Sequence, residues 1–420
     1  MGAGKAMTRK VEERLIVALD IGTSKVAAVV GEVRGDGIIN ILGVGTHPSR
    51  GLRKGVVVNI EATIQSIQRA IEEAESASSC QIHSVYTGIT GSHISSFNSH
   101  GVVPIRDKEA TNLDVDRVID AARAVAIPAD RKVLQILPQG FVIDKQEGIR
   151  DPIGMSGVRL EARVHIVTGS ESAAYNVVKC IQRCNLEVDD LILGPVASSH
   201  AVLSEDEKNL GVCLVDIGGG TADIAVFSEG FIHHTGVIPV AGDQVTSDIA
   251  VYQRTPTHNA EEIKIGYGCA MPDWMEPEEL IEVPSVGDRP PRQLLRRSLA
   301  EVMHWRVEEL LKLVQAELQR SGFEGRIPAG LVLTGGTSQM PGIIDLAEQI
   351  FRMPARLGTP QRSQSILGDY SVINNPAYAT GVGLLMFGAE ARNAVIPDAG
   401  GTLGVRGVLR RLRGWFQGNF

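Results

Sequence analysis

The sequence predicts a two-lobed α/β protein with a small α/β domain inserted in its first lobe and an amphipathic helix at its C-terminus. Residues 14–79 and residues 210–250 both read as three strands followed by a helix, and each copy places an aspartate before a turn with glycine and threonine. The length of 420 residues also exceeds what one hydrophobic core usually serves. Because the two copies are alike, we expect two similar lobes that face each other across one ligand-binding cleft.

The first lobe is expected to begin with an antiparallel meander. The turns DIGTS and RGDG separate three apolar, β-branched runs. The helix that follows has apolar residues at helical spacing, namely Ile60, Ile64, Ile67 and Ile71. We assign residues 1–84 and 166–195 to this lobe.

The inserted domain is expected between the two parts of the first lobe. Residues 85–165 contain a weaker α/β pattern, with a helix expected over 113–127 and a strand over 133–143. This stretch is long enough to form a small domain of its own.

The second lobe is assigned to residues 196–389, with a smaller subdomain at about 245–325. Residues 276–297 are rich in proline and arginine and predict a loop, and a long amphipathic helix follows to about Leu318. Residues 390–404 contain glycine, proline and alanine without periodicity and predict a linker.

The composition is that of a folded globular protein, with 43% hydrophobic and 21% charged residues. No apolar run approaches the roughly 18 to 20 residues of a membrane-spanning helix, and the charged N-terminus leads directly into a strand, so we expect a cytoplasmic protein. The net charge is −8, but residues 405–420 contain four arginines and no acid, which leaves −12 for the other 404 residues. An acidic body argues against nucleic acid as a partner.

Three glycine-containing turns predict a phosphate-binding cleft. The first follows Asp20 (DIGTSK), the second follows Asp216 (DIGGGTAD), and the third lies in LVLTGGTSQMPGI at 331–343. Glycines let the backbone approach a phosphate closely, and successive N–H groups bind anions. Alone, the first could be an ordinary strand turn with a solvated Lys25, and the third an ordinary turn between a strand and a helix. Their combination, in this order, favours the cleft.

This combination resembles the actin, sugar kinase and heat-shock chaperone superfamily, in which two hairpins hold the phosphates of ATP and a third loop meets the adenosine. Within it, the sequence is similar to the FtsA family of bacterial cell-division proteins, which are actin-like and attach the FtsZ ring to the inner membrane. Four stretches carry this resemblance and together span nearly the whole chain: DPIGMSGVRLEARVHIVTG, VLSEDEKNLGVCLVDIGGGTADIAVFSEG, SVGDRPPR and GVRGVLRRLRGWFQGNF.

The resemblance implies a site for ATP and Mg²⁺. Asp20 and Asp216 would organise the metal through water, which suits a hard cation that takes oxygens from one or two carboxylates and from phosphates. Other residues would bind the phosphates (Gly22, Thr23, Ser24, Lys25, Gly218, Gly219, Gly220, Thr221), the adenosine (Gly335, Gly336, Thr337) and the base or ribose (Glu262, Lys264). Gly194 precedes Pro195 where many relatives have an acid, which implies weak ATPase activity at most.

The C-terminal helix, residues 405–420, is expected to dock on a membrane. Its apolar residues share one face of a helical wheel, and its four arginines lie outside that face. Each arginine near an anionic leaflet contributes about 1 kcal/mol. The alternative is a terminal helix that packs on the body. The residues expected at the membrane are Val408, Leu409, Arg410, Arg411, Leu412, Arg413, Trp415, Phe416 and Phe420.

The FtsA resemblance also implies partners: the C-terminal peptide of FtsZ, further copies of the chain in a filament, later division proteins and an anionic lipid surface. Guanidinium groups pair well with carboxylates, so an acidic peptide could bind a set of basic residues, unless these form a solvated helix face. The set is Arg289, Arg292, Arg296, Arg297 and Arg306.

Two rival functions remain open. One is a soluble kinase or phosphatase of the same superfold, since a fold alone does not decide a function. The C-terminal helix argues against it. The other is a different actin-like scaffold, against which the insertion and the RPPR loop argue.

Overall fold

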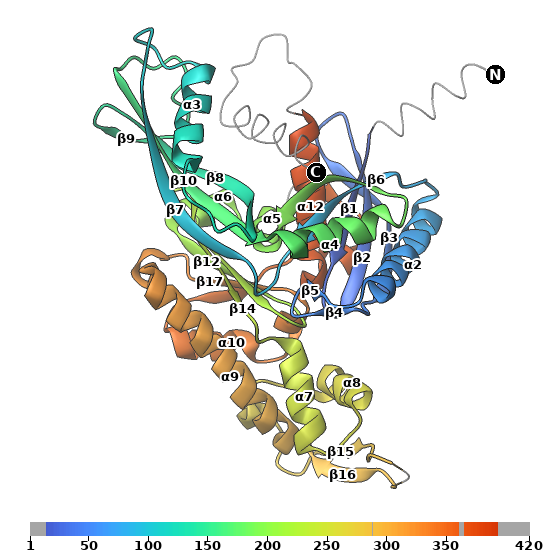
Figure 1. Ribbon diagram of the computed structural model, residues 1–420. Coiled ribbons are helices and arrows are strands. Elements are labelled where there is room, and N and C mark those ends of the chain that lie inside the picture. The colour runs from blue at the N-terminus through green and yellow to red at the C-terminus, as the bar shows by residue number, and fades with distance from the viewer. Residues whose placement is uncertain (1–13, 288, 361–364, 394–420) are drawn as a thin grey trace, which may run out of the picture.

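Two central β-sheets, a smaller third sheet and the helices that cover them make up the structure, a computed structural model that describes residues 14–287, 289–360 and 365–393 (Figure 1). The first sheet has the strand order β11-β6-β1-β2-β3-β19, and the second has the order β14-β13-β12-β17-β18. The third sheet, β7-β10-β8-β9, belongs to the insertion. The mixed α/β fold expected from the sequence is confirmed.

The first sheet begins with the predicted meander, in which β1 pairs with β2 and β2 with β3, both antiparallel. Helix α2 (Ile60–Ser78) follows, and the Asn59 side chain caps it by accepting from the Ala62 N–H at 3.1 Å. Strands β6 and β11 extend the sheet in parallel, and α4 (Glu171–Gln182) packs against α2. The strands are β1 (Leu15–Ile21), β2 (Lys25–Val33), β3 (Ile39–Pro48), β6 (Ser84–Ile89), β11 (Glu187–Leu193) and β19 (Ile366–Leu367), with a small ladder of β4 (Leu52–Arg53) and β5 (Val56–Val57).

The second sheet repeats this order, as the sequence predicts. Strands β12, β13 and β14 form an antiparallel meander, α7 (Gly242–Tyr252) follows, and β17 and β18 add in parallel. The strands are β12 (Val212–Ile217), β13 (Ala222–Ser228), β14 (Phe231–Ile238), β17 (Leu331–Thr334) and β18 (Ala355–Leu357). Around this sheet lie α6 (Glu205–Leu210), η2 (Glu324–Arg326), η3 (Gly336–Gln339) and α10 (Ile343–Phe351).

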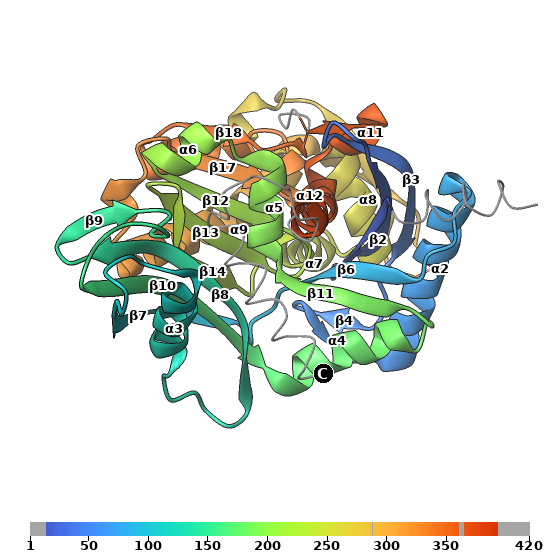
Figure 2. The same cartoon turned by 90° about the horizontal axis from the view of Figure 1, so that it is seen from above.

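Two helices, α5 (Gly194–Val202) and α12 (Ala379–Asn393), lie between the two sheets (Figure 2). They pack on each other, with α5 also against β12 and β13 and α12 against β1 and β2. One apolar core joins the two sheets through these helices, and it includes Ala18, Ala197, Leu214 and Val382. The two sheets therefore cannot separate without disturbing α5 and α12.

The C-terminal part of the described chain returns to the first sheet. Strand β19 pairs with β3, and α11 (Tyr370–Ile373) and η5 (Pro376–Tyr378) lead into α12. Strand β19 thus lies in the first sheet and α12 packs against both this sheet and α5, although the sequence analysis assigns residues up to 389 to the second lobe. The pairing joins segments more than 300 residues apart, and no local pattern marks it.

The insertion is a four-stranded sheet with α3 (Asn112–Arg123) on one face (Figure 1). The expected helix ends earlier than residue 127, at Arg123, because Ala124 leaves the helical conformation with ψ 56°. The predicted strand over 133–143 is confirmed within β8. The strands are β7 (Ser95–Pro104), β8 (Arg131–Ile143), β9 (Gln146–Ile149) and β10 (Arg159–Ser170).

Polar side chains join the insertion to β14 of the second sheet. His165, only 1% exposed, bonds Asn98 Oδ1 through Nδ1 at 2.7 Å and Thr235 Oγ1 through Nε2 at 2.9 Å. An amide oxygen can only accept a hydrogen bond, so Nδ1 of His165 carries a proton. Burial lowers the pKa of His165 to about 3, so the ring is neutral and its Nε2 accepts a hydrogen bond from the Thr235 hydroxyl. Ser96 and Gln139 add bonds to β14 carbonyls.

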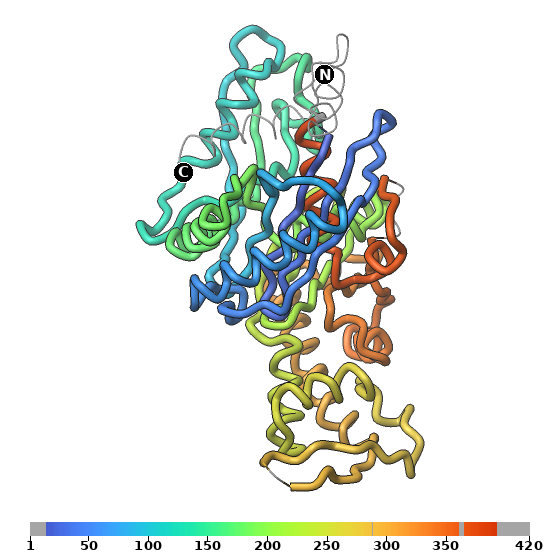
Figure 3. The backbone as a smooth tube through the Cα atoms, turned by 90° about the vertical axis from the view of Figure 1, so that its right-hand side faces the viewer, coloured from blue at the N-terminus to red at the C-terminus, as the bar shows by residue number. Residues whose placement is uncertain are grey.

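The subdomain beyond α7 lies at the far end from the insertion (Figure 3). It contains α8 (Thr257–Tyr267), η1 (Pro272–Trp274) and the long helix α9 (Arg296–Ser321). The loop expected over 276–297 is wrong in part, because β15 (Leu280–Val283) and β16 (Arg292–Leu295) form a hairpin there. Ile281 and Val283 are buried and alternate with exposed residues, a strand pattern too short to stand out between flanking prolines.

Among the helices of the described ranges, none combines the length and the apolar character that crossing a bilayer requires. The predicted linker from residue 394 onward and the predicted C-terminal helix lie outside the described residues.

Candidate functional site

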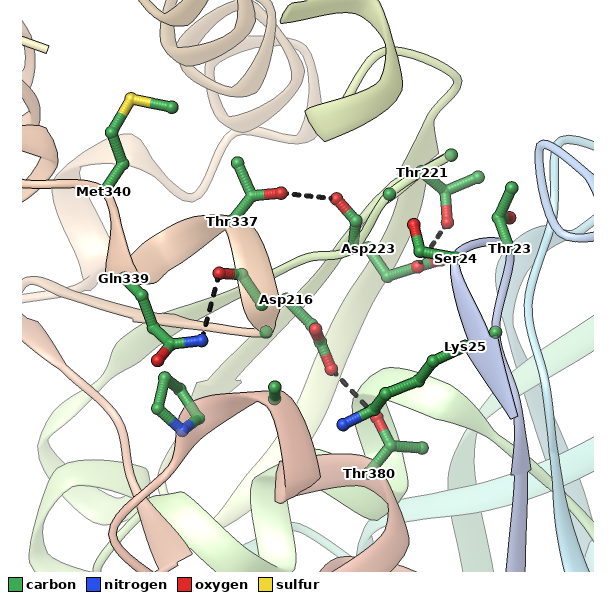
Figure 4. Close-up of a pocket in the computed structure, with 18 of the residues that line it drawn as sticks. Thr23, Ser24, Lys25, Asp216, Thr221, Asp223, Thr337, Gln339, Met340 and Thr380 are labelled. Carbon is green, nitrogen blue, oxygen red and sulfur yellow. Dashed lines mark hydrogen bonds between the residues drawn. The ribbon is translucent and has the colours of Figure 1, made fainter. Parts of the chain in front are cut away.

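A cavity of about 560 Å³ lies where the three predicted turns meet (Figure 4). The first turn connects β1 to β2, the second connects β12 to β13, and the third follows β17. The structure thus brings together residues from three distant parts of the chain: Asp20, Gly22, Thr23, Ser24, Lys25, Asp216, Gly218, Gly219, Gly220, Thr221, Gly335, Gly336 and Thr337.

The first two turns have the same backbone geometry. The Gly22 N–H donates to the Lys25 carbonyl at 3.0 Å, and the Gly218 N–H donates to the Thr221 carbonyl at 2.9 Å. The third turn is tied to the second, since Thr337 Oγ1 donates to the Gly218 carbonyl at 2.7 Å. Three turns held in this way form a rigid, glycine-lined wall that suits phosphate groups.

Three carboxyl groups gather at the floor of the cavity: the buried Asp223 and the half-buried Asp20 and Asp216. Burial raises the pKa of Asp20 to about 6 and that of Asp223 to about 8, and it also raises the pKa of Asp216. Asp216 Oδ2 accepts from Ser198 and Thr380, whose hydroxyls fix its orientation.

Asp223 was not singled out from the sequence, although it ends the DIGGGTAD motif. Its Oδ2 accepts from Thr221 Oγ1 at 2.9 Å, whereas its buried Oδ1 has no hydrogen-bond partner among the described residues. A buried oxygen without a partner costs free energy unless a ligand satisfies it. Among the described residues no cluster of three or more Asp, Glu, His or Cys side chains is arranged to hold a metal ion directly, so a hard cation here would take its oxygens from water and from a ligand's phosphates, beside Asp20 and Asp216.

Lys25 supplies positive charge at this floor. Burial lowers the pKa of its ammonium, and the charges of Asp20 and Asp216 raise it in part. Its Nζ lies 3.6 Å from the ring centroid of Tyr378, a residue that the sequence analysis did not single out. The alternative interpretation, an ordinary strand turn with a solvated Lys25, therefore does not agree with the structure.

The other end of the cavity is lined by α8 and by residues after the third turn. Lys264 lines it, pairs with Glu261 at 2.6 Å and donates to Thr246 Oγ1 at 2.9 Å. Glu262, predicted here, does not line the cavity; it accepts from Asn259 at the surface. Residues 261, 264 and 265 are three and four positions apart and so share one face of α8. From Lys264, this spacing could have identified Glu261 as a residue of the cavity. Also present are Ile265, Gln339, Met340, Pro341, Pro376 and Ala377.

Gly194, at the position where an acid was expected from relatives, leaves no room for a side chain. A Cβ on this residue would lie 2.4 Å from Cγ2 of Thr90, which itself lines the cavity. The described residues therefore place no carboxylate at this point.

The arginines predicted as a partner surface are mostly engaged within the subdomain. Arg296 pairs with Glu279 at 2.9 Å and Arg306 with Asp248, while Arg292 donates to a backbone carbonyl. The predicted membrane residues, from Val408 to Phe420, lie outside the described residues.

Two arginines of this set differ from the rest. Arg297 pairs with Asp273 at 2.8 Å and with Glu301 at 3.5 Å, and its side chain is 42% exposed. Arg289 is exposed and has no ion pair with the described residues. Arg289 is therefore open to an acidic ligand, and Arg297 could meet one by exchanging a partner.

Comparison with known proteins places the chain. The family model for "Cell division protein FtsA" matches residues 213–383, and that for "SHS2 domain inserted in FTSA" matches residues 91–168. The Cell division protein FtsA of Pseudomonas aeruginosa is 60% identical over 97% of this chain and 98% of its own length. The chain belongs to the FtsA family of cell division proteins. The FtsA of Escherichia coli K12 is 46% identical over 99% of this chain and 100% of its own.

Solved structures confirm the actin-like fold expected for an FtsA protein. A chain of the "PilM-PilN type IV pilus biogenesis complex" superposes with a TM-score of 0.65 at 17% identity, and covers 89% of this chain and 98% of its own. MreB5 of Spiroplasma citri bound to ADP gives a TM-score of 0.56 at 14% identity, with 91% and 98% covered. At these identities the likeness shows the fold alone.

Proposed function

We propose that this FtsA-family protein binds ATP, polymerises on the cytoplasmic face of the inner membrane at the division site, tethers the FtsZ ring there and recruits later division proteins. The observation that carries the proposal is the cavity in which three glycine-containing turns from distant parts of the chain meet three carboxyl groups. Its volume of about 560 Å³ lies within the usual range of small-molecule sites.

In the proposed site, the first two turns hold the phosphates and the third meets the adenosine, with Lys264 at the base or ribose. Asp20 and Asp216 organise Mg²⁺ through water. An actin-like neighbour of the same fold, MreB5, was solved with ADP.

Nucleotide acts mainly on conformation and assembly in this proposal. The residue before Pro195 is Gly194 and not an acid, and Thr90 occupies the space that a side chain at this position would need. We therefore propose weak ATP hydrolysis at most, and no metabolic phosphate transfer.

The C-terminal helix supplies membrane attachment in the proposal. Its four arginines contribute roughly 4 kcal/mol at an anionic leaflet, to which burial of its apolar face adds. One such helix binds reversibly, whereas a filament of subunits presents many helices at once and attaches firmly. Polymerisation and membrane binding then reinforce each other.

The FtsZ contact is proposed at the arginines of the subdomain. Arg289 is exposed and unpaired among the described residues, and Arg297 can exchange the exposed Asp273 for another acid at little cost, because exposed ion pairs are weak. The C-terminal peptide of FtsZ, if acidic, would replace Asp273. Later division proteins would bind the insertion.

The test is co-sedimentation with anionic liposomes in Mg·ATP, with and without purified FtsZ. It compares the full chain, a chain truncated after residue 404 and a full chain whose four C-terminal arginines are changed to glutamine. Pelleting of the full chain alone, with FtsZ carried along, supports the proposal. A full chain that stays in the supernatant would sink it and favour the kinase or phosphatase alternative, for which substrate-dependent phosphate transfer is the positive assay.

A further inference from the structure

Residues 375–380, which lead from η5 into α12, contact all three turns of the cavity. The Gly335 N–H of the third turn donates to the Pro376 carbonyl at 3.2 Å. Thr380 Oγ1 donates to Asp216 Oδ2 of the second turn at 3.1 Å. This segment is therefore a fourth wall of the site, although no glycine-rich motif marks it in the sequence.

Its contact with the first turn is made by an aromatic ring. Lys25 Nζ lies 3.6 Å from the centroid of the Tyr378 ring, well within the roughly 6 Å of a cation–π contact. Lys25 forms no ion pair within 4.0 Å among the described residues, although three aspartates line the same cavity. Figure 4 shows the Lys25 side chain beside Thr380 and the Asp216 carboxylate.

The ring itself is held in place. The Tyr378 N–H donates to the Asn375 carbonyl at 3.1 Å, and Asn375 Oδ1 accepts from the Ala377 N–H at 2.9 Å, so η5 is capped and rigid. The tyrosine hydroxyl makes no hydrogen bond with the described part of the chain. The ring face, not the hydroxyl, is what the contact uses.

A lysine side chain is a flexible four-carbon stem with a compact charge at its end. Without the ring, the Lys25 ammonium could turn to the carboxylates beside it and pair with one of them. With the ring, the ammonium has a partner that carries no charge, so its own charge stays available to an anion. The same ring therefore fixes the position of the ammonium and preserves its charge.

We propose that Tyr378 is the positioning residue for Lys25, and that its ring holds the ammonium in the cavity where the phosphate groups of a bound nucleotide meet it. This inference rests on the nucleotide site proposed above. It adds an aromatic contact from the C-terminal part of the chain to a site otherwise made of glycine-containing turns.

The experiment is isothermal titration of the full chain with Mg·ATP. Tyr378→Leu removes the π face but keeps apolar bulk, and we expect the Kd to rise about fivefold to tenfold. Tyr378→Phe restores the ring and should return the Kd to within about twofold of the parent value. Tyr370→Leu is the matched control, since Tyr370 is 62% exposed on α11 and makes no cation–π contact with the described residues.

A double variant separates positioning from a general effect on structure. In a Lys25→Met chain, Tyr378→Leu should add no further loss, because the ammonium that the ring positions is gone. Tyr378→Met is a second ringless variant, and thermal unfolding checks that each variant is folded.

Three outcomes overturn the proposal: a ringless variant that binds like the parent, a Phe variant that does not restore binding, or an equal loss with and without Lys25. A parent chain that binds no Mg·ATP overturns the nucleotide site itself and this inference with it. A parent that binds, with ringless variants that do not differ from it, overturns only the role of Tyr378.

Discussion

Replacement of Gly335 by alanine should destabilise the protein strongly. This glycine opens the third turn with φ +85° and ψ 166°, a backbone conformation that is essentially restricted to glycine. Forcing another residue into it costs about 1–3 kcal/mol. The added Cβ would also lie 2.5 Å from the Ile217 carbonyl oxygen and 2.4 Å from Asp216 Oδ1.

The clash cannot be relieved locally. Ile217 ends β12, and β12 pairs with β17 up to Asp216 and Thr334, directly before the glycine. Overpacking of this kind costs about 1–3 kcal/mol. The two penalties together predict a loss of about 2–6 kcal/mol. For a loss of about 3 kcal/mol in a chain of 420 residues, the Tm falls by roughly 3 °C, because the entropy of unfolding grows with chain length.

The neighbouring glycine provides the control. A Cβ on Gly336 would meet only Ala377 Cβ at 3.8 Å, an ordinary contact, and its φ is not in the positive range. Gly336→Ala should leave stability unchanged or raise it by up to about 1 kcal/mol, because alanine restricts the unfolded chain. Thermal unfolding of both variants without nucleotide is the assay. Two variants that melt within 1 °C of each other, on the order of experimental error, would refute the reasoning.

Three further predictions concern charge and polar contacts. Burial raises the pKa of Asp223 from its ordinary 3.8 to about 8, so between these values the folded protein holds a proton that the unfolded chain has lost. Nucleotide-free stability should therefore fall as pH rises through this window, and Asp223→Asn should reduce that fall, as measured by the Tm at several pH values. His165→Leu leaves the buried Thr235 hydroxyl without its acceptor and should cost roughly 1–3 kcal/mol in denaturant unfolding. His100→Leu, on an exposed position of the same sheet, should stay within about 0.5 kcal/mol, and equal losses would contradict the role of the buried bonds. Charge reversal at both Arg289 and Arg297 should weaken binding of the FtsZ C-terminal peptide at least tenfold, on the order of two lost charge pairs, with no change in Tm. Unchanged peptide affinity would place the FtsZ contact elsewhere.

Much of the fold was predictable because its information is local. Each meander contains its own strands and turn, and the apolar spacing of α2 and the glycines of DIGGGTAD are visible within short windows. The three turns could be placed at one site because the repeated order of elements implies two sheets that face each other. The prediction failed where the rotation of a helix decides which side chain faces the cavity. Glu262 was predicted there, but its neighbour Glu261 lines the cavity instead.

What the sequence could not supply are contacts between remote segments. Thr380 and Asp216 lie 164 residues apart, and nothing in the sequence around either indicates their hydrogen bond. The return of β19 to the first sheet is hidden in the same way, because a two-residue strand has no periodicity. The hairpin β15–β16 is likewise too short for its alternation to be distinguished from a loop.

The glycines of the second turn also serve the contact between the two sheets. A Cβ on Gly219 would lie 1.8 Å from Ser24 Oγ, so the backbone of the second turn touches the Ser24 side chain of the first. Ser24 Oγ also donates to Asp243 Oδ1, at the start of α7, at 3.4 Å. If phosphates bind between these turns as proposed, the atoms that hold the ligand are also those that set the distance between the sheets. Phosphate entry must then change that distance or replace these contacts, because both occupy the same space. This gives a physical reason why nucleotide would act on the conformation, and through it on assembly, even in a protein with little hydrolysis.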